Sequence, residues 1–250
     1  MAGDSSLDNK YWIKNDFMGA ENGYECILNP PLMLPDICYH LNDNLSNYYT
    51  INTAIEASTL MDRQNGLLPQ DKIIQEYITN NDVLIVSIGG NDIALKPSVK
   101  TIYNMLMMTY MNSTDMIKQG PGSAWGMNYF IKMFKDDVEK YILKLIGNKK
   151  PKKIIVCMIY YPDQTETGSW ADRTLGALNY NTNPEKLQAA IKQIFIHATN
   201  KIEIPGCNVV PFPMFTVLDG KDTYDYSARV EPSSQGGRKL AEAFASVINK

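Results

Sequence analysis

Histidine is almost absent from this sequence, since His40 and His197 are the only two in 250 residues. So few imidazoles exclude a histidine-rich metal site. Paired cysteines are missing too, and the four cysteines stand far apart: Cys26, Cys38, Cys157 and Cys207. This spacing fits neither a disulfide framework nor a zinc site and indicates buried thiols in a reducing compartment.

The sequence also has no long apolar run and no excess of positive charge. Its longest apolar stretches, VLIVSI from Val83 and IIVCMI from Ile154, are strand length and too short to span a bilayer. Polar residues directly follow Met1 where a signal peptide would be apolar, which predicts a cytoplasmic protein. The formal net charge of -3 argues against a nucleic-acid partner bound through a basic surface. Nothing in the composition indicates a cofactor, a metal or an oligomeric state.

What the sequence does contain is an alternation of apolar and helical segments. Four apolar runs predict strands: YYTINTA from Tyr48, VLIVSI from Val83, KIIVCMI from Lys153 and NVVPFPMF from Asn208. Their continuous hydrophobicity is typical of strands buried on both faces of a parallel sheet. Between and after them, helical periodicity predicts helices over 34–46, 128–148, 182–202 and 233–250. We therefore predict a single domain over 1–250, a three-layer α/β/α sandwich with a mainly parallel, flavodoxin-like sheet.

The first strand of this sheet is expected to be short. Only Met1 and Ala2 precede the Gly3 turn, where about five apolar residues are usual. Either the first strand is vestigial or residues upstream are missing from this sequence. In both cases we expect 1–4 to lie beside the strand that begins at Val83.

Two short motifs point to a family. Gly3-Asp4-Ser5 and, directly after a buried strand, VSIGGND from Val86 resemble blocks of the SGNH, or GDSL-type, hydrolases, and the match follows the whole chain in order. The resemblance implies that Ser5 is a nucleophile and that its N–H helps to form an oxyanion hole. It implies the same oxyanion-binding role for the Asn91 amide and for the backbone N–H of Ala57. The family has glycine where Ala57 stands, and alanine can serve if the backbone does not need a positive φ.

The last block of the family differs from this chain. An aspartate, two residues and His-Pro are expected before the final helix, whereas the chain reads Ala228-Arg229-Val230-Glu231-Pro232. Glu231 thus stands at the histidine position and Ala228 at the aspartate position. A glutamate has a pKa about two units below that of histidine, so Glu231 can act as a base only if it is desolvated. An ion pair with Arg229 would instead keep it ionised and favour a structural or binding role.

Other residues in the segments that follow the strands are candidates for substrate binding. Arg63, Arg173 and Arg229 together suggest a crevice for an anionic group, although a structural ion pair is the alternative for each. Tyr161 and its neighbour Tyr160 can line a pocket or simply anchor a loop. The long loop over 162–184 is expected to cover the substrate.

Two functions from different classes follow. The first is a serine hydrolase acting on acyl or acetyl esters of a small molecule, with Glu231 as an atypical base. The second is a catalytically silent relative that binds a small acyl or anionic ligand, or a protein partner, in the same crevice. A nucleotide-binding domain is a weaker alternative, because neither GxGxxG nor GxxxxGK[ST] is present.

Overall fold

The structure, a computed structural model, describes residues 1–14 and 16–250. Its main sheet is parallel and has the strand order β1-β4-β5-β6. These four strands are β1 (Ala2–Gly3), β4 (Val83–Ser87), β5 (Lys153–Met158) and β6 (Val209–Pro213). A small antiparallel pair, β2 (Met18–Gly19) and β3 (Leu32–Met33), lies apart from it. A mainly parallel sheet is therefore confirmed.

The abbreviated first strand is confirmed as well. Ala2 and Gly3 pair with Val86 and Ser87 of β4. On the other side of β1, the Thr53 N–H donates to the Met1 carbonyl at 2.9 Å. The run from Tyr48 does not form a strand as predicted, because two residues of β1 offer too short a partner, yet the segment lies in the place of one. With this segment counted, the order is that of a flavodoxin-like sheet, 2-1-3-4-5.

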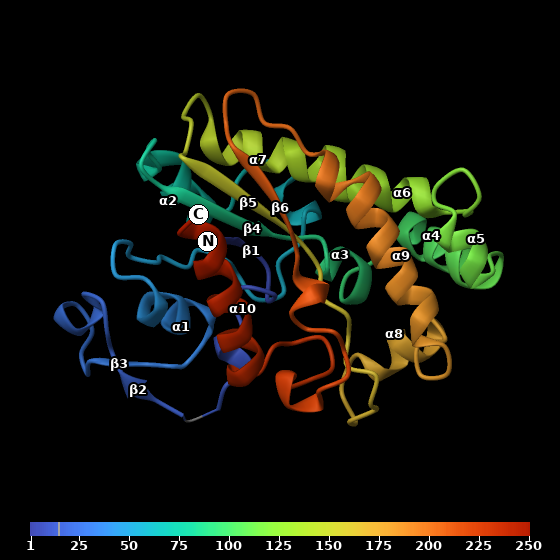
Figure 1. Cartoon of the computed structure of the whole chain (residues 1–250), viewed down its shortest axis with the longest axis horizontal. Helices are drawn as coiled ribbons and strands as arrows, with labels where there is room; N and C mark the ends of the chain where they lie inside the picture. Colours follow the sequence, from blue (N-terminus) through green and yellow to red (C-terminus); the bar gives the residue numbers. More distant parts are fainter. Residues whose placement is uncertain (15) are drawn as a thin grey trace.

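Helices connect these strands and cover both faces of the sheet (Figure 1). They are α1 (Ile37–Asn44), α2 (Pro69–Tyr77), α3 (Asn91–Ala94), α4 (Val99–Tyr110), α5 (Thr114–Lys118), α6 (Met127–Lys132), α7 (Val138–Ile146), α8 (Asp172–Ala177), α9 (Pro184–His197) and α10 (Ser234–Ile248). A π-helical turn, Met133–Asp137, joins α6 to α7 without a break. The long helix predicted over 128–148 is thus present, and it ends at Gly147, which has a φ of 56°.

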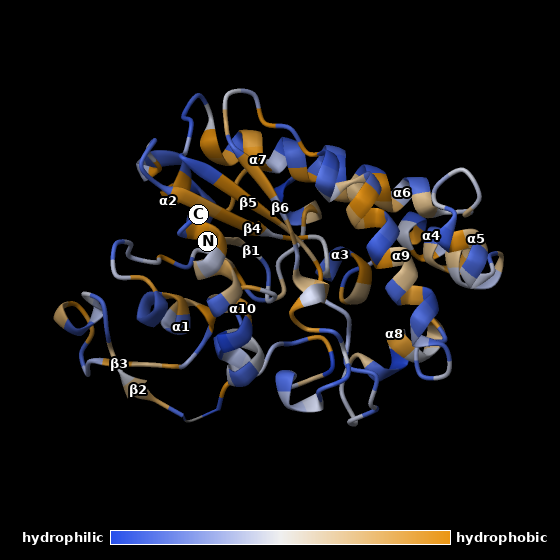
Figure 2. Cartoon of the chain, viewed as in Figure 1, coloured by the Kyte–Doolittle hydropathy of each residue, from blue (hydrophilic) through white to orange (hydrophobic). Residues whose placement is uncertain are grey.

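Alternate strand residues enter two separate cores. Leu84, Val86 and Ile154 pack with α6, α7 and α9 on one face of the sheet. Ile85 and Ile155 pack with α1 and α10 on the other face. The apolar strands and the inward sides of the helices stand out in Figure 2. Because side chains alternate along a strand, this division establishes the three-layer α/β/α architecture.

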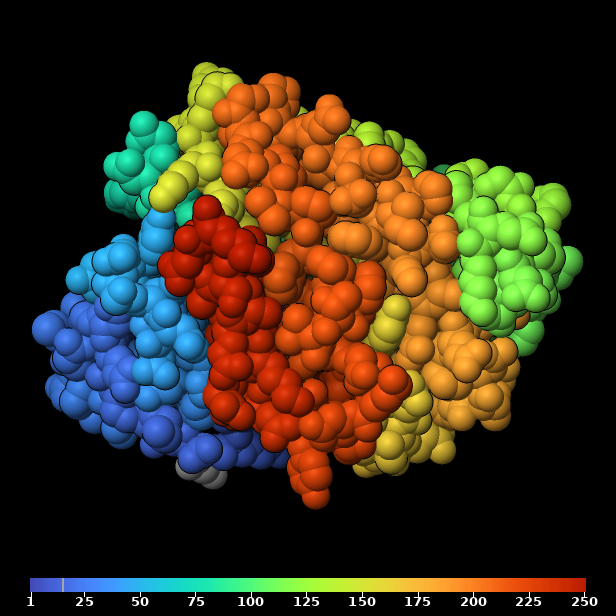
Figure 3. All heavy atoms as spheres, viewed as in Figure 1, coloured from blue at the N-terminus to red at the C-terminus, as the bar shows by residue number. Residues whose placement is uncertain are grey.

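The first and last helices pack together, although they are distant in sequence. Helix α10 begins after Ser233, whose hydroxyl accepts from the Gly236 N–H, and it lies against α1. Helix α1 is capped by Asp36, whose side chain accepts from the Tyr39 N–H, and Pro35 lies just before the helix. The C-terminal residues, orange to red in Figure 3, cover the middle of this side of the protein. Among residues 1–14 and 16–250, no helix has both the length and the apolar character needed to cross a membrane.

Candidate active site

Ser5 lies in a tight turn at the carboxyl end of β1. Gly3 has a φ of 142°, and a Cβ at this position would lie 1.7 Å from the Ser87 carbonyl oxygen, so only glycine fits. Asp4 holds the turn, because its Oδ1 accepts the Ser6 N–H at 3.1 Å and the Ser6 hydroxyl at 2.7 Å. The turn places Ser5 where ligands bind in parallel α/β sheets.

The three expected oxyanion donors come from three different segments. Within the described residues, neither the Ser5 N–H nor the Ala57 N–H has a protein acceptor. Asn91, the first residue of α3, donates one amide hydrogen to the Ser58 carbonyl at 3.1 Å, which leaves its second hydrogen unassigned. Asn91 and Ser5 line the same cavity, which brings two of these donors to one site.

Ala57 differs from the expectation in its backbone. Alanine was expected to replace the family's glycine only if the backbone here did not need a positive φ. Ala57 has a φ of 58°. An L-residue in this region carries a cost of roughly 1–2 kcal/mol that glycine avoids. The Arg63 guanidinium helps to hold the neighbouring backbone, since its Nη1 donates to the Thr59 carbonyl at 2.9 Å and to the Ser58 hydroxyl at 3.0 Å.

Glu231 is buried in the same cavity, with only 2% of its surface exposed. Its Oε2 has no hydrogen-bond partner among the described residues. Burial raises its pKa to about 8; the neighbouring Ser5 hydroxyl opposes this rise, while the charges of Asp4 and Glu56 add to it. The carboxyl is therefore desolvated and lies beside Ser5.

Arg229 does not pair with Glu231. Its backbone has a φ of 60°, and its side chain donates to the Asp163 carbonyl and to the Asp172 carboxylate, both at 3.0 Å. Its guanidinium also lies over the Tyr180 ring, 5.9 Å from the centroid. Arg229 therefore stabilises the loop over 162–184, and the alternative in which it neutralises Glu231 is wrong.

The other arginines do not form the expected anion crevice. Arg63 is buried and forms an ion pair with Asp71 at 2.8 Å, and it lies in a separate polar pocket. Arg173 is exposed and does not line the cavity that contains Ser5. Arg63 and Arg229 have structural carboxylate partners, and neither lines the cavity that contains Ser5, although Nη2 of Arg229 has no hydrogen-bond partner among the described residues.

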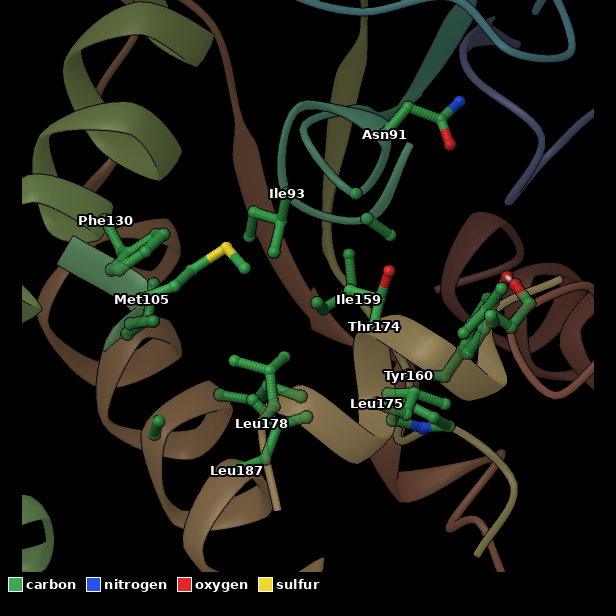
Figure 4. A pocket seen from close by; sticks show the side chains of 18 of the residues that line it. Asn91, Ile93, Met105, Phe130, Ile159, Tyr160, Thr174, Leu175, Leu178 and Leu187 are labelled. Atoms are coloured by element: carbon green, nitrogen blue, oxygen red, sulfur yellow. Dashed lines mark hydrogen bonds between the residues drawn. The ribbon is translucent and has the colours of Figure 1, made fainter. Parts of the chain in front are cut away.

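A deep, largely apolar cavity extends from Ser5, with a volume of about 130 Å³. Figure 4 shows Asn91 and Tyr160 on one side, and Met105 and Phe130 on the other. Tyr160 lines the cavity and donates to the Val230 carbonyl at 2.6 Å. Tyr161 does not line it, because its ring stacks on Phe215 at 5.1 Å in the apolar core. The proposed pocket tyrosine is thus Tyr160 rather than Tyr161.

The loop over 162–184 does contribute to this cavity. Trp170, Leu175 and Leu178 from the loop are among the lining residues. The indole N–H of Trp170 is buried and has no acceptor among the described residues. Helices α4 and α9 supply much of the remaining wall. Sequence reasoning missed their role, and the only available signal was the run of methionines in TIYNMLMMTY, because Met is common at adaptable apolar surfaces.

The two histidines and Asp92 lie away from the cavity that contains Ser5. His40 is within 3.2 Å of the Ser234 hydroxyl, and His197 lies beside Gly120; neither lines the cavity. Asp92 accepts the Leu60 N–H at 2.8 Å and faces the polar pocket of Arg63. In the part of the chain that the structure describes, no three His, Cys, Asp or Glu side chains are grouped to hold a metal ion.

No protein-family model matches this sequence, and no curated protein matches it. Among solved structures, the chain is similar to Est24, a carbohydrate acetylesterase from Sinorhizobium meliloti. The identity is 15%, the match covers 99% of this chain and 96% of that one, and the TM-score is 0.48. A mutant of Axe2, an acetyl-xylooligosaccharide esterase from Geobacillus, is 15% identical over 100% and 92% of the two chains, with a TM-score of 0.46. An aryl esterase of M. smegmatis is 12% identical over 99% and 96%, with a TM-score of 0.44.

Proposed function

We propose that this chain, as one domain of the SGNH type over 1–250, is a serine ester hydrolase in which Glu231 replaces the usual histidine as the base. One observation carries the proposal: Ser5 lines the same cavity as the buried carboxyl of Glu231, which among the described residues has an unpartnered oxygen and no ion-pair partner. An ordinary carboxylate is too weak a base for a serine hydroxyl. A pKa of about 8 makes Glu231 a stronger base than a typical histidine, whose pKa is about 6.5.

The reaction follows from these positions. Ionised Glu231 takes the Ser5 proton while Oγ bonds to the ester carbonyl carbon. The N–H groups of Ser5 and Ala57 and the Asn91 amide stabilise the oxyanion that forms. Glu231 then returns the proton to the leaving alkoxide as the C–O bond breaks, which leaves an acyl-serine. Water, deprotonated by Glu231, attacks this acyl group and releases the acid, and Ser5 regains its proton.

Ala228 fits this scheme. In the histidine-based family, the aspartate holds the imidazole in one tautomer and orientation. A carboxylate base has no tautomer to select, so Glu231 does not need that partner. Replacing the histidine with Glu231 therefore also removes the need for the aspartate. The aspartate position is occupied by Ala228, which is small and buried.

The test is hydrolysis of p-nitrophenyl esters between pH 5 and 10. We expect kcat/KM to rise with pH through about 8, because only ionised Glu231 accepts a proton. Ser5→Ala should lower turnover on the order of 10³-fold or more, and Glu231→Gln by roughly 10²–10⁴-fold. Ser246→Ala and Glu242→Gln, on the exposed side of α10, are the matched controls and should behave as the unmodified chain. Unchanged turnover in Ser5→Ala would overturn the proposal.

The second candidate is ligand binding without turnover. It is favoured by the same pKa, since a group that titrates near 8 is about nine-tenths protonated at pH 7. The two functions separate at pH 9, where Glu231 is ionised. Absence of ester hydrolysis at pH 9, together with ligand-dependent thermal stabilisation, would favour the binding protein. Gain of turnover in Glu231→His would then show that the oxyanion site is intact.

A further inference from the structure

The cavity beside Ser5 has a polar end and a long apolar remainder. Asp4, Ser5, Asn91 and Glu231 form the polar end. Away from it, the wall is built by α4, α6, α8 and α9, with Met105, Phe130 and Leu187 at a distance from Asn91 (Figure 4). An acetyl group has one methyl and cannot fill such a space. An apolar cavity of roughly 150 Å³ accommodates benzene, so about 130 Å³ holds a group of comparable size.

The chemistry of the reaction determines which half of an ester enters this space. Glu231 must reach the leaving oxygen in order to protonate it, which keeps the alcohol at the Glu231 end. The wall that continues from Asn91 through Ile93 to Met105 is then left for the acyl chain (Figure 4). Asp4 and Glu231 are both acidic, and among the described residues neither forms an ion pair, because Arg63 and Arg229 pair with other carboxylates. Their charges disfavour alcohols that carry phosphate or carboxylate groups.

We propose that the cavity is an acyl-chain site and that the substrates are esters of neutral alcohols with apolar acids of roughly six to eight carbons. The inference rests on the proposed hydrolase function and adds its substrate class. Each buried methylene contributes about 0.8 kcal/mol, which is about fourfold in kcat/KM per methylene until the cavity is filled. Esters of hexanoic and octanoic acid should therefore exceed acetate esters by tenfold or more.

Two isomeric esters test the orientation directly. Ethyl octanoate and octyl acetate have the same atoms, but the long chain is on the acid in the first and on the alcohol in the second. We expect kcat/KM to be at least tenfold higher for ethyl octanoate. An equal or higher value for octyl acetate would overturn the assignment of the cavity to the acyl chain, as would a preference for acetate across a series of ethyl esters.

A pair of variants on α9 tests the cavity itself. Ala190 lines the cavity and is 2% exposed, whereas its neighbour Ala189 does not line it. Ala190→Phe should lower the ratio of kcat/KM for ethyl octanoate over ethyl acetate at least tenfold. Ala189→Phe should leave that ratio unchanged. If Ala190→Phe does not fold by circular dichroism, Met105→Trp fills the far end of the same cavity and should lower the ratio in the same way.

Binding separates this inference from the proposed function. Octanamide is neutral, so it avoids repulsion by Asp4 and Glu231, and Ser5→Ala cannot hydrolyse it by the proposed route. Calorimetry should show octanamide binding to Ser5→Ala and at least tenfold weaker binding when Ala190→Phe is added. Binding without hydrolysis of any ester supports the acyl site and overturns the hydrolase. Ester hydrolysis without octanamide binding and without chain-length preference overturns the acyl site and leaves the hydrolase.

Discussion

Two buried clusters of ionisable side chains lie next to each other around the turn that holds Ser5. In the first, Arg63 pairs with Asp71 at 2.8 Å and also donates to the Gly3 carbonyl at 3.2 Å. In the second, Asp4 and Glu231 approach each other, and neither forms an ion pair with any of the described residues, although the charge of Arg63 acts to lower the pKa of Asp4. Both clusters are shielded from water. They differ in whether their polar atoms are satisfied.

In the Arg63 cluster, each guanidinium nitrogen has an acceptor, and Asp71 also accepts the Tyr141 hydroxyl at 2.7 Å. In the Asp4 and Glu231 cluster, one carboxyl oxygen of each residue has no hydrogen-bond partner within the described part of the chain. Burial accordingly raises the pKa of Asp4 to about 6 and that of Glu231 to about 8. A satisfied cluster supports the fold, whereas an unsatisfied one leaves carboxyl oxygens able to take up a proton.

The largest expected effect comes from breaking the satisfied cluster. Arg63→Met removes the charge from a buried ion pair and leaves Asp71 without its cationic partner, which should lower the free energy of unfolding by about 3–5 kcal/mol. Urea denaturation measures this change. The control is Arg238→Met, an exposed position in an i,i+4 pair with Glu242, where we expect less than about 0.5 kcal/mol. If Arg63→Met does not fold, Arg63→Lys should fold and still lose more stability than Arg238→Lys.

Removing the charge of Glu231 from the unsatisfied cluster should instead raise the free energy of unfolding. The folded state holds the Glu231 proton up to about pH 8, while the unfolded chain releases it near 4.5. The folded state therefore binds more protons between these values, and stability falls as pH rises across this window. Glu231→Gln should remove this loss and stabilise the chain on the order of 3 kcal/mol at pH 9, with little change at pH 4.

Thermal melts of both chains at pH 4 and pH 9 measure this effect. Glu242→Gln, at an exposed site, is the matched control and should show no such dependence. A Glu231→Gln chain that is less stable at pH 9 than the unmodified chain would mean that the ionised carboxyl has a stabilising partner, and the contrast between the two clusters would fail. If Glu231→Gln both stabilises the chain and loses turnover, Glu231 lowers stability and is retained for its function.

A smaller loss of stability is expected from a change at Tyr141, which belongs to the satisfied Arg63 cluster. Tyr141→Phe removes the hydroxyl that donates to Asp71 and changes little else in a side chain that is 3% exposed. One buried carboxylate oxygen then loses a donor, and we expect a loss of about 1–2 kcal/mol in the free energy of unfolding. Tyr103→Phe, on the exposed side of α4, should change it by less than about 0.5 kcal/mol. Equal effects would show that Asp71 is satisfied without Tyr141.

The fold was largely predictable because its signals are local. Apolar runs and helical periodicity depend on neighbouring residues, and three of the four runs form β4, β5 and β6 as predicted. The run from Tyr48 failed as a strand because a strand needs a partner of sufficient length. The partner, β1, has two residues.

The candidate site was predictable only in part. The sequence placed Ser5, Asn91 and Glu231 after strands or before a helix, and the structure brings them to one cavity. Whether Arg229 reaches Glu231 depends on a φ of 60° that directs the chain toward Asp163 and Asp172, and the sequence does not specify such a turn. The choice between adjacent tyrosines failed for a similar reason, because successive side chains in an extended segment point to opposite sides.

The last prediction concerns the coupling between the two acidic residues. Asp4 titrates near pH 6, so it is charged at pH 8 and adds to the burial that raises the Glu231 pKa. Asp4→Asn removes this charge, while its amide oxygen can still accept the Ser6 N–H as Oδ1 does at 3.1 Å. The pKa of Glu231 should then fall, and the inflection of the pH–rate profile should move down by roughly half a unit.

The matched control for this change is Asp219→Asn. Asp219 is exposed and forms an ion pair with Lys221, so its charge should not move the inflection. A downward shift in Asp4→Asn alone identifies the titrating base as a group that lies close to Asp4, which Glu231 does. An unchanged inflection, with turnover retained, would show that the base is remote from Asp4 and would remove Glu231 from the mechanism without affecting the assignment of Ser5.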